Sequence, residues 1–242
     1  MSGHSKWSQI KRQKEKTDIK KGLTFTKLAN AIIIAVREGG GIADPNQNFR
    51  LRLAIDSARA SNMPKENIER AIQRAAKKEA GDIKEVIYEG FAPEGVSVIV
   101  EAATDNPQRT TAEIKNLFNK AGGSFGQPGS VLYQFTQVGR ITVGKNGNTF
   151  DEIFSIAVES GAEDIEEEDG NILVFTSAFD LSKIRDSLVR SGLKILDARL
   201  TRKPTITTEV LDTQKLSKIK NFLETINSLE DVQNVYSNLA QL

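Results

Sequence analysis

The sequence predicts an α+β fold in which an N-terminal three-helix domain is followed by two ferredoxin-like α+β domains, one inserted in the other. Two patterns along the 242 residues support this prediction. Up to Gly81, apolar residues recur every three or four positions, as in amphipathic helices. After Gly81, short runs alternate with period two between turns and further helical stretches. The 38% hydrophobic content is sufficient to bury a sizeable core.

The helical domain is expected over residues 23–81 and contains three helices. The first carries apolar residues between Phe25 and Val36 and ends at three consecutive glycines, which favour the left-handed turn at a helix C-terminus. The second begins near Asp44 and Pro45, because aspartate caps a helix and proline suits its first turn. The third follows the stretch NMPKEN, and its apolar stripe consists of Ile68, Ala71, Ile72, Ala75 and Ala76.

The first α+β domain is expected to be discontinuous, combining residues 82–137 with residues 204–242. The earlier segment begins with two strands, IKEVIYEGF and VSVIVEAAT, which are joined by the turn APEG. They are followed by a helix, DNPQRTTAEIKNLFNKAGG, and by a third strand, SVLYQF. This ββαβ unit lacks a second helix and a final strand. The tail supplies both, as strand TITTEVL, helix TQKLSKIKNFLETIN and strand VQNVYS. The alternative is three consecutive domains, with the C-terminal piece packing elsewhere.

The inserted domain is expected over residues 138–203, where strands and helices alternate. RITV, NILVFT and KILDARL have strand patterns, and TFDEIFSIAVESG and FDLSKIRDSLVRSG are the helices between them. The acidic stretch EDIEEED can add a further edge strand. This order suits a small split-βαβ sandwich of the ferredoxin-like type.

Charge is divided unevenly along the chain, although its formal net charge is only +1. Residues 1–80 contain seventeen Lys and Arg against eight Asp and Glu, a net charge of +9. The remaining residues contain sixteen basic and twenty-four acidic side chains, a net charge of −8. Such a division favours a polyanionic partner for the basic part. A solvated lysine-rich helix is the alternative explanation.

Residues 1–22 form a basic leader that has too few apolar groups to fold alone, so we expect it to be flexible until it docks. It holds the only tryptophan, Trp7, and the only histidine, His4. Lysines attract phosphates, whereas an indole stacks on a base, worth about 1–3 kcal/mol per base. Alternatively, Trp7 docks onto the helical domain. The candidate nucleic-acid contacts are His4, Lys6, Trp7, Lys11, Arg12, Lys14, Lys16, Lys20, Lys21, Lys27, Arg37, Arg50 and Arg52.

We expect no enzyme activity, cofactor or metal site. The chain has no cysteine, and a single histidine in a flexible leader cannot be held in a catalytic triad. Two S-x-x-K matches lack companion motifs, and GGSFGQPG follows a helix, the reverse of the order in a phosphate-binding loop. In EDIEEEDG, the EF-hand register places Ile165 at the first ligand position, which excludes that calcium loop.

No membrane segment or small-molecule substrate is expected either. The longest apolar run, Ala31–Val36, is far shorter than the roughly 18 residues that a spanning helix requires. The N-terminus has charges where a secretion signal has an apolar core. We therefore expect a cytoplasmic protein.

Several separate motifs resemble the YebC/PmpR family. They are the leader GHSKWSQIKRQKEKTDIKKG with FTKL, and the stretches NFRLRLAIDSARASNMPKENIERAI, YEGFAPEGVSVIVEAATDNPQRT and GSVLYQF. The resemblance implies a three-domain protein, with a helical domain and two α+β domains of which one is inserted. It also implies a cytoplasmic nucleic-acid-binding regulator without a known cofactor. Leu23 departs from the pattern, because members often have a basic residue there.

Three functional hypotheses follow. Members of the family are described as probable DNA-binding transcriptional regulators, so the first is binding of duplex DNA, although the sequence alone isolates no recognition helix. The second is a ribosome-associated translation factor, because mitochondrial and some bacterial relatives act at the ribosome and an aromatic residue among lysines suits the unstacked bases of ribosomal RNA. The third is a scaffold whose acidic α+β domains bind a basic protein.

Overall fold

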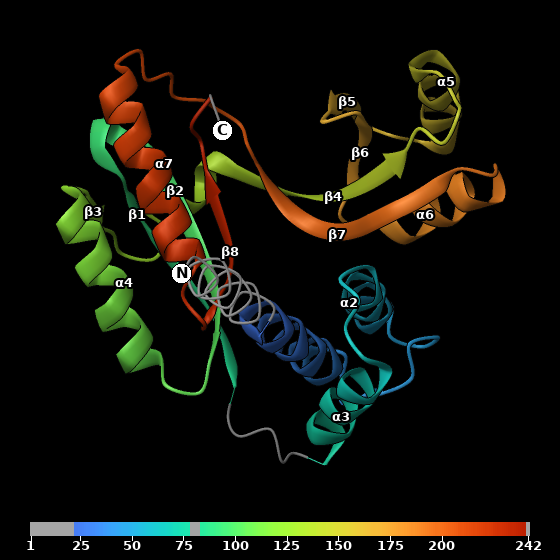
Figure 1. Cartoon of the computed structure of the whole chain (residues 1–242), viewed down its shortest axis with the longest axis horizontal. Coiled ribbons are helices and arrows are strands. Elements are labelled where there is room, and N and C mark those ends of the chain that lie inside the picture. The colour runs from blue at the N-terminus through green and yellow to red at the C-terminus, as the bar shows by residue number, and fades with distance from the viewer. Residues whose placement is uncertain (1–21, 78–82, 241–242) are drawn as a thin grey trace, which may run out of the picture.

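The computed structural model describes residues 22–77 and 83–240, which form a helical part and two α+β parts (Figure 1). The predicted fold class is confirmed: a helical region comes first, and two four-stranded antiparallel sheets follow it. We call residues 22–77 the helical domain, the sheet β3-β1-β2-β8 the first sheet, and the sheet β5-β6-β4-β7 the second sheet. The basic leader predicted over residues 1–22 lies outside the described residues, apart from Gly22, which is helical.

The helical domain consists of a helix through residues 22–38, α2 (Phe49–Ala60) and α3 (Lys65–Ala76). Its core is built from the predicted apolar stripes, including the fully buried Ile32, Ile33 and Leu51. The prediction that α2 begins near Asp44 and Pro45 is wrong, because residues 45–47 form a turn and the N-cap is Asn48.

Asn48 joins the first two helices through both ends of its amide. Its Oδ1 accepts a hydrogen bond from the Leu51 amide at 3.0 Å, which caps α2. Its Nδ2 donates to the carbonyls of Ala35 (2.8 Å) and Ile42 (3.0 Å). A Cβ at Gly39 would lie 2.2 Å from this Nδ2, so glycine is required there. This buried amide therefore sets the starting point of α2.

The first sheet combines strands from both ends of the α+β sequence. Its strands are β1 (Lys84–Phe91), β2 (Ser97–Thr104), β3 (Ser124–Phe125) and β8 (Val232–Ser237), and each neighbouring pair is antiparallel. Helices α4 (Pro107–Ala121) and α7 (Thr213–Asn227) cover one face. Fully buried Phe118 lies between Phe125 and Phe222, with ring centroids 6.0 and 5.0 Å away. The tail thus completes the sheet that residues 84–125 begin.

The second sheet lies between these two parts in sequence. It contains β4 (Phe135–Gly144), β5 (Asp164–Glu168), β6 (Asn171–Ser177) and β7 (Lys194–Pro204). Helices α5 (Phe150–Ser160) and α6 (Leu181–Arg190) pack on it, and β5 is the edge strand expected from EDIEEED. Pairing of β4 with β7 extends from Phe135 opposite Pro204, so the proposed boundaries 138 and 203 fall within these strands. We call residues 135–204 the inserted domain.

The prediction of SVLYQF as one strand is wrong. Residues 130–134 form a bend and the short 3₁₀ helix η2 (Leu132–Gln134), and only Phe135 enters a strand, which belongs to the second sheet. The cause is Glu89, a buried carboxylate that accepts hydrogen bonds from backbone amides at 2.6–2.8 Å. These donors cannot also join a strand ladder. The donating amides are those of Gly129, Val131 and Leu132.

Two further predictions from the sequence are wrong, one in the glycine-rich segment and one in the C-terminal tail. Residues 124–125 of GGSFGQPG, where no strand was expected, are strand β3, paired with Gly90 and Phe91. TITTEVL, expected to be a strand, forms only an isolated bridge from Thr208 to Leu239. No helix in the described ranges is long and apolar enough to cross a membrane.

Replacing Phe118 by alanine should lower the free energy of unfolding by about 3–5 kcal/mol, because it leaves a cavity between the sheet and both helices. Urea denaturation followed by circular dichroism measures the change. Phe179→Ala is the matched control, since this ring is 99% exposed and its loss should cost within about 0.5 kcal/mol. Equal losses in the two variants would contradict this packing.

Asp231 links the end of β2 to the start of α4 and should make stability depend on pH. Its carboxylate accepts hydrogen bonds from Thr110 (2.6 Å), Arg109 (2.9 Å) and Thr104 (3.1 Å). Burial alone would raise the pKa of Asp231, but these three hydrogen bonds outweigh it and hold the pKa below its usual value.

A depressed pKa stabilises the fold above the ordinary aspartate pKa, and this contribution is lost as pH falls through the lowered value. We therefore expect Asp231→Asn to lower unfolding free energy at neutral pH, and the difference from wild type to shrink on acidification. Asp105→Asn is the control, because Asp105 is exposed and contacts only Arg109 of these partners. A difference that is independent of pH would refute the assignment.

Candidate nucleic-acid interface

Most of the predicted nucleic-acid contacts precede the described residues. The structure therefore provides no geometry for them, and they stay sequence-based predictions. The contacts outside the described residues are His4, Lys6, Trp7, Lys11, Arg12, Lys14, Lys16, Lys20 and Lys21.

Lys27, on the first helix, points into the protein. Its ammonium group donates a hydrogen bond to the carbonyl of Asn227, the last residue of α7. A cation at this position satisfies an unpaired carbonyl and complements the negative end of the helix dipole. Burial lowers the pKa of Lys27 from its usual value. Lys27 thus attaches the helical domain to the first α+β part.

Arg50, on α2, makes a second attachment. Its guanidinium contacts both carboxylate oxygens of Glu85 on β1 at 3.1 Å and also pairs with Glu38. The side chain is 43% exposed, so the pair is screened by water and contributes modestly to stability. Its position nevertheless joins α2 to the first sheet.

The other two described candidates also make contacts within the protein. Arg37 donates to the carbonyl of Ile83 at 2.8 Å, where the chain enters β1. Arg52 donates to Ser182 Oγ of the inserted domain at 3.2 Å and lies over the Phe49 ring, 5.2 Å from its centroid. Lys27 and Arg50 line one cavity, whereas Arg37 and Arg52 lie elsewhere.

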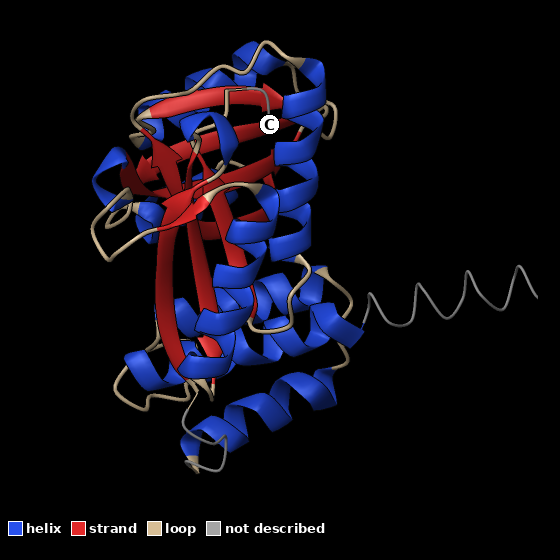
Figure 2. Cartoon of the chain, turned by 90° about the vertical axis from the view of Figure 1, so that its left-hand side faces the viewer, coloured by secondary structure: helices blue, strands red, loops and turns tan. Residues whose placement is uncertain are grey.

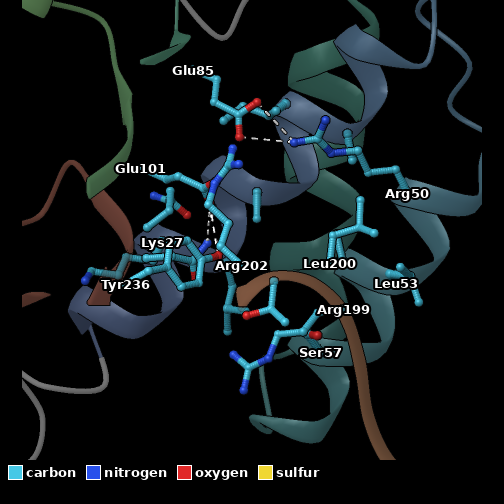
Figure 3. A pocket seen from close by; sticks show the side chains of 18 of the residues that line it. Lys27, Arg50, Leu53, Ser57, Glu85, Glu101, Arg199, Leu200, Arg202 and Tyr236 are labelled. Atoms are coloured by element: carbon cyan, nitrogen blue, oxygen red, sulfur yellow. Dashed lines mark hydrogen bonds and ion pairs between the residues drawn. The ribbon is translucent and has the colours of Figure 1, made fainter. Parts of the chain in front are cut away.

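That cavity, of about 510 Å³, lies where the helical domain and both sheets meet (Figure 3). At its centre Glu101 of β2 accepts a hydrogen bond from Arg202 Nε of β7 at 2.8 Å. Its other oxygen accepts hydrogen bonds from Asn234 and Tyr236 of β8, each at 3.1 Å. Both charged side chains of the pair are only 13% exposed. This cluster therefore joins the two sheets through a buried charge.

The Tyr236 phenol in this cluster is held in its neutral form. Burial, followed by the charge of Glu101 and the hydrogen bond to it, raises the pKa of the Tyr236 phenol well above its usual value. Tyr236 is therefore a neutral donor to Glu101 across the physiological range. The sequence marked Glu101 only indirectly, as the one charge within the apolar run VSVIVEAAT. Its partners, far along the chain, could not be identified from sequence.

The helical domain has further exposed cations outside the predicted set, among them two on α3 and one at its C-cap. Arg70, Arg74 and Lys77 are exposed, and none makes an ion pair with any other described residue. Their spacing of four and three residues, on the side opposite the apolar stripe, is the sequence signal that identifies them. The described residues contain no group of three or more side chains suited to holding a metal ion.

The acidic residues lie mainly on the α+β parts. The edge strand β5 carries Glu166, Glu167 and Glu168. Lys203 pairs with Asp164 and Glu166 at 2.6 and 2.7 Å, and neighbouring β5 carboxylates remain exposed. A phosphate backbone is therefore favoured by the helical domain and repelled by this strand.

Two family models match almost the whole chain. Residues 5–78 match the family model described as the TACO1/YebC protein N-terminal domain, and residues 83–239 match the TACO1/YebC second and third domain. The chain belongs to the TACO1/YebC family. The resemblance expected from the leader and the later motifs is thereby confirmed.

Relatives of this TACO1/YebC chain extend over nearly its full length. A probable transcriptional regulatory protein from Thermoanaerobacter pseudethanolicus is 44% identical, over 99% of this chain and 97% of the relative. One from Sulfurihydrogenibium is 45% identical, over 98% and 95%. The crystal structure of a conserved hypothetical protein from Aquifex aeolicus superposes with a TM-score of 0.86 at 39% identity, covering 92% of this chain and 91% of that one.

Within this TACO1/YebC chain, the Glu101–Arg202 pair should be a main determinant of stability. Arg202→Ala leaves a buried carboxylate without its cation, which should cost about 3–5 kcal/mol in urea denaturation. Arg199→Ala, on the same strand, is the control: its side chain is 50% exposed in a pair with Asp197, so the cost should be about 0–1 kcal/mol. A loss in Arg202→Ala no larger than the control would show that the pair is dispensable.

Proposed function

We propose that the protein is a regulator of transcription that binds DNA through its positively charged N-terminal third. The observation that carries this proposal is the division of charge, +9 over residues 1–80 against −8 over the rest. The names of the full-length relatives support the regulatory part of the proposal. We propose binding without catalysis or a cofactor, and the cytoplasmic location expected from the sequence.

The contacts made by the helical domain indicate which cations orient this domain and which bind phosphates. Lys27, Arg37, Arg50 and Arg52 are engaged with other parts of the protein, so their main role in the proposal is to orient the helical domain. The leader cations then supply most phosphate contacts. Opposite charge on the α+β parts keeps those parts away from the polyanion and leaves them available for a basic protein partner.

A ribosome-associated translation factor is the second candidate function. It is favoured by the position of Trp7 among the leader lysines. An indole needs an unstacked base to lie against, and ribosomal RNA offers many such bases whereas duplex DNA offers few. The two candidates therefore differ in the nucleic acid that the full chain prefers.

Binding of the full chain to duplex DNA, single strands and ribosomes should be measured across a salt series. If about six cations contact phosphates, the logarithm of the binding constant should fall with that of salt at a slope near −5. Lys6→Ala should reduce this slope by about one, and Trp7→Ala should weaken binding to unpaired bases by about 5-fold or more. Lys218→Ala, on the exposed side of α7, should change neither.

The preferred ligand in that series separates the two candidates. Tighter binding to duplex DNA supports transcriptional regulation, and tighter binding to ribosomes supports the translational role. A response independent of salt, or full binding after deletion of residues 2–22, would refute the leader as the phosphate-binding element in both.

A further inference from the structure

The outer face of α3 carries side chains suited to reading bases. Arg70, Gln73 and Lys77 are exposed and follow one another at intervals of three and four residues, so they share one side of the helix. The opposite side is buried in the helical domain through Ile68 and Ala71. The helix therefore presents a narrow polar stripe directly away from its own core.

These side chains have no partner within the described residues, in contrast to the cations on the first two helices. The side chains of Arg70, Gln73 and Lys77 make no ion pair or hydrogen bond with the rest of the described chain. The ion pair found on α3 joins Lys65 to Glu69 at 3.5 Å, near its start. No existing contact within the described ranges would have to be broken for a ligand to bind the stripe.

The connection between α2 and α3 fixes the stripe in place. Residues 61–64 form a short turn in which Asn62 adopts a left-handed conformation (φ 57°) and Met63 is buried in the domain core. A turn of this length is one of the features of a helix-turn-helix, a motif whose second helix enters the major groove. α3 lies at the outer edge of the molecule in both views (Figures 1 and 2).

The residue types fit base edges in the major groove. Arginine donates two hydrogen bonds to guanine O6 and N7, and glutamine pairs with adenine N6 and N7. The twelve residues of α3 span about 18 Å, and a major groove about 12 Å wide admits one helix. The major groove of A-form RNA is too deep and narrow for this contact. The chemistry therefore favours B-form DNA over double-stranded RNA.

A neighbouring acidic groove limits how the duplex can approach. Arg74, beside the stripe, lines a groove that also contains Asp105, Glu113 and Glu230. These carboxylates repel phosphates, so the backbone would lie on the side of α3 away from them. Arg74 is accordingly not assigned to the reading stripe.

We infer that α3 is a recognition helix that reads B-form DNA in the major groove, with Arg70 and Gln73 contacting base edges and Lys77 a phosphate. This inference rests on the proposed function, since it presupposes that the protein binds DNA. The inference assigns a separate role to each element: the leader binds any phosphate backbone, and α3 provides the sequence preference.

Selection of random duplexes by the full chain should enrich a short motif, and methylation of guanine N7 within that motif should block binding. Arg70→Ala and Gln73→Ala should each weaken binding to the motif by about 10-fold or more and leave binding to random duplex nearly unchanged. Arg190→Ala is the matched control, because this arginine is likewise exposed on a helix, in the last turn of α6 on the inserted domain. It should bind the motif like wild type.

The outcomes separate this inference from the proposed function. If the full chain binds duplexes with a steep salt dependence but enriches no motif, or if Arg70→Ala retains the wild-type motif and affinity, then α3 is not a reading helix and the leader-based function stands. If the full chain binds ribosomes or single strands but not duplexes, DNA is not its ligand. Circular dichroism of each variant excludes loss of folding as the cause.

Discussion

The arrangement of the three parts depends on one buried negative charge, the carboxylate of Glu101. This carboxylate lies on the face of β2 turned away from α4 and α7, where an unpaired charge would be strongly destabilising. Arg202 from β7, with Asn234 and Tyr236 from β8, compensates it with three hydrogen bonds. Because the donors come from both sheets, satisfying this charge also fixes how the inserted domain sits on the first sheet.

The helical domain is positioned by a second set of contacts, of which those of Lys27 and Arg50 line the same cavity. Lys27 reaches the end of α7, Arg50 reaches β1, and α2 contacts the inserted domain through Asp56, which pairs with Arg185 at 2.7 Å. Lys27 and Arg50, both predicted nucleic-acid contacts, therefore also hold the helical domain in place. Within the helical domain, Arg70, Arg74 and Lys77 are exposed and make no ion pair with another described residue, so this domain separates the cations that hold the protein together from those available to a ligand.

Secondary-structure elements that depend on local sequence patterns were predicted correctly. Elements that depend on contacts with residues far along the chain were not. Apolar periodicity identified the three helices and the strands around APEG, because each of these patterns reports a face that must be buried. The start of α2 was misplaced because Asn48 bonds to carbonyls of the preceding helix. SVLYQF has strand composition, but Glu89 removes the amides that a strand would use. Glu101 is recognisable in the sequence as a charge within an apolar run, but the residues around it do not indicate which distant side chains pair with it.

The paired strands β4 and β7 also bear on how this architecture can vary. The chain leaves the first α+β part at Phe135 and returns at Pro204, and these two residues face each other across the ladder. A short hairpin could bridge that gap without rethreading the first sheet or its two helices. The inserted domain is thus a lateral branch on the first α+β part, and a shortened form of it would have to retain Arg202, because the Glu101 carboxylate would otherwise be buried without its cation.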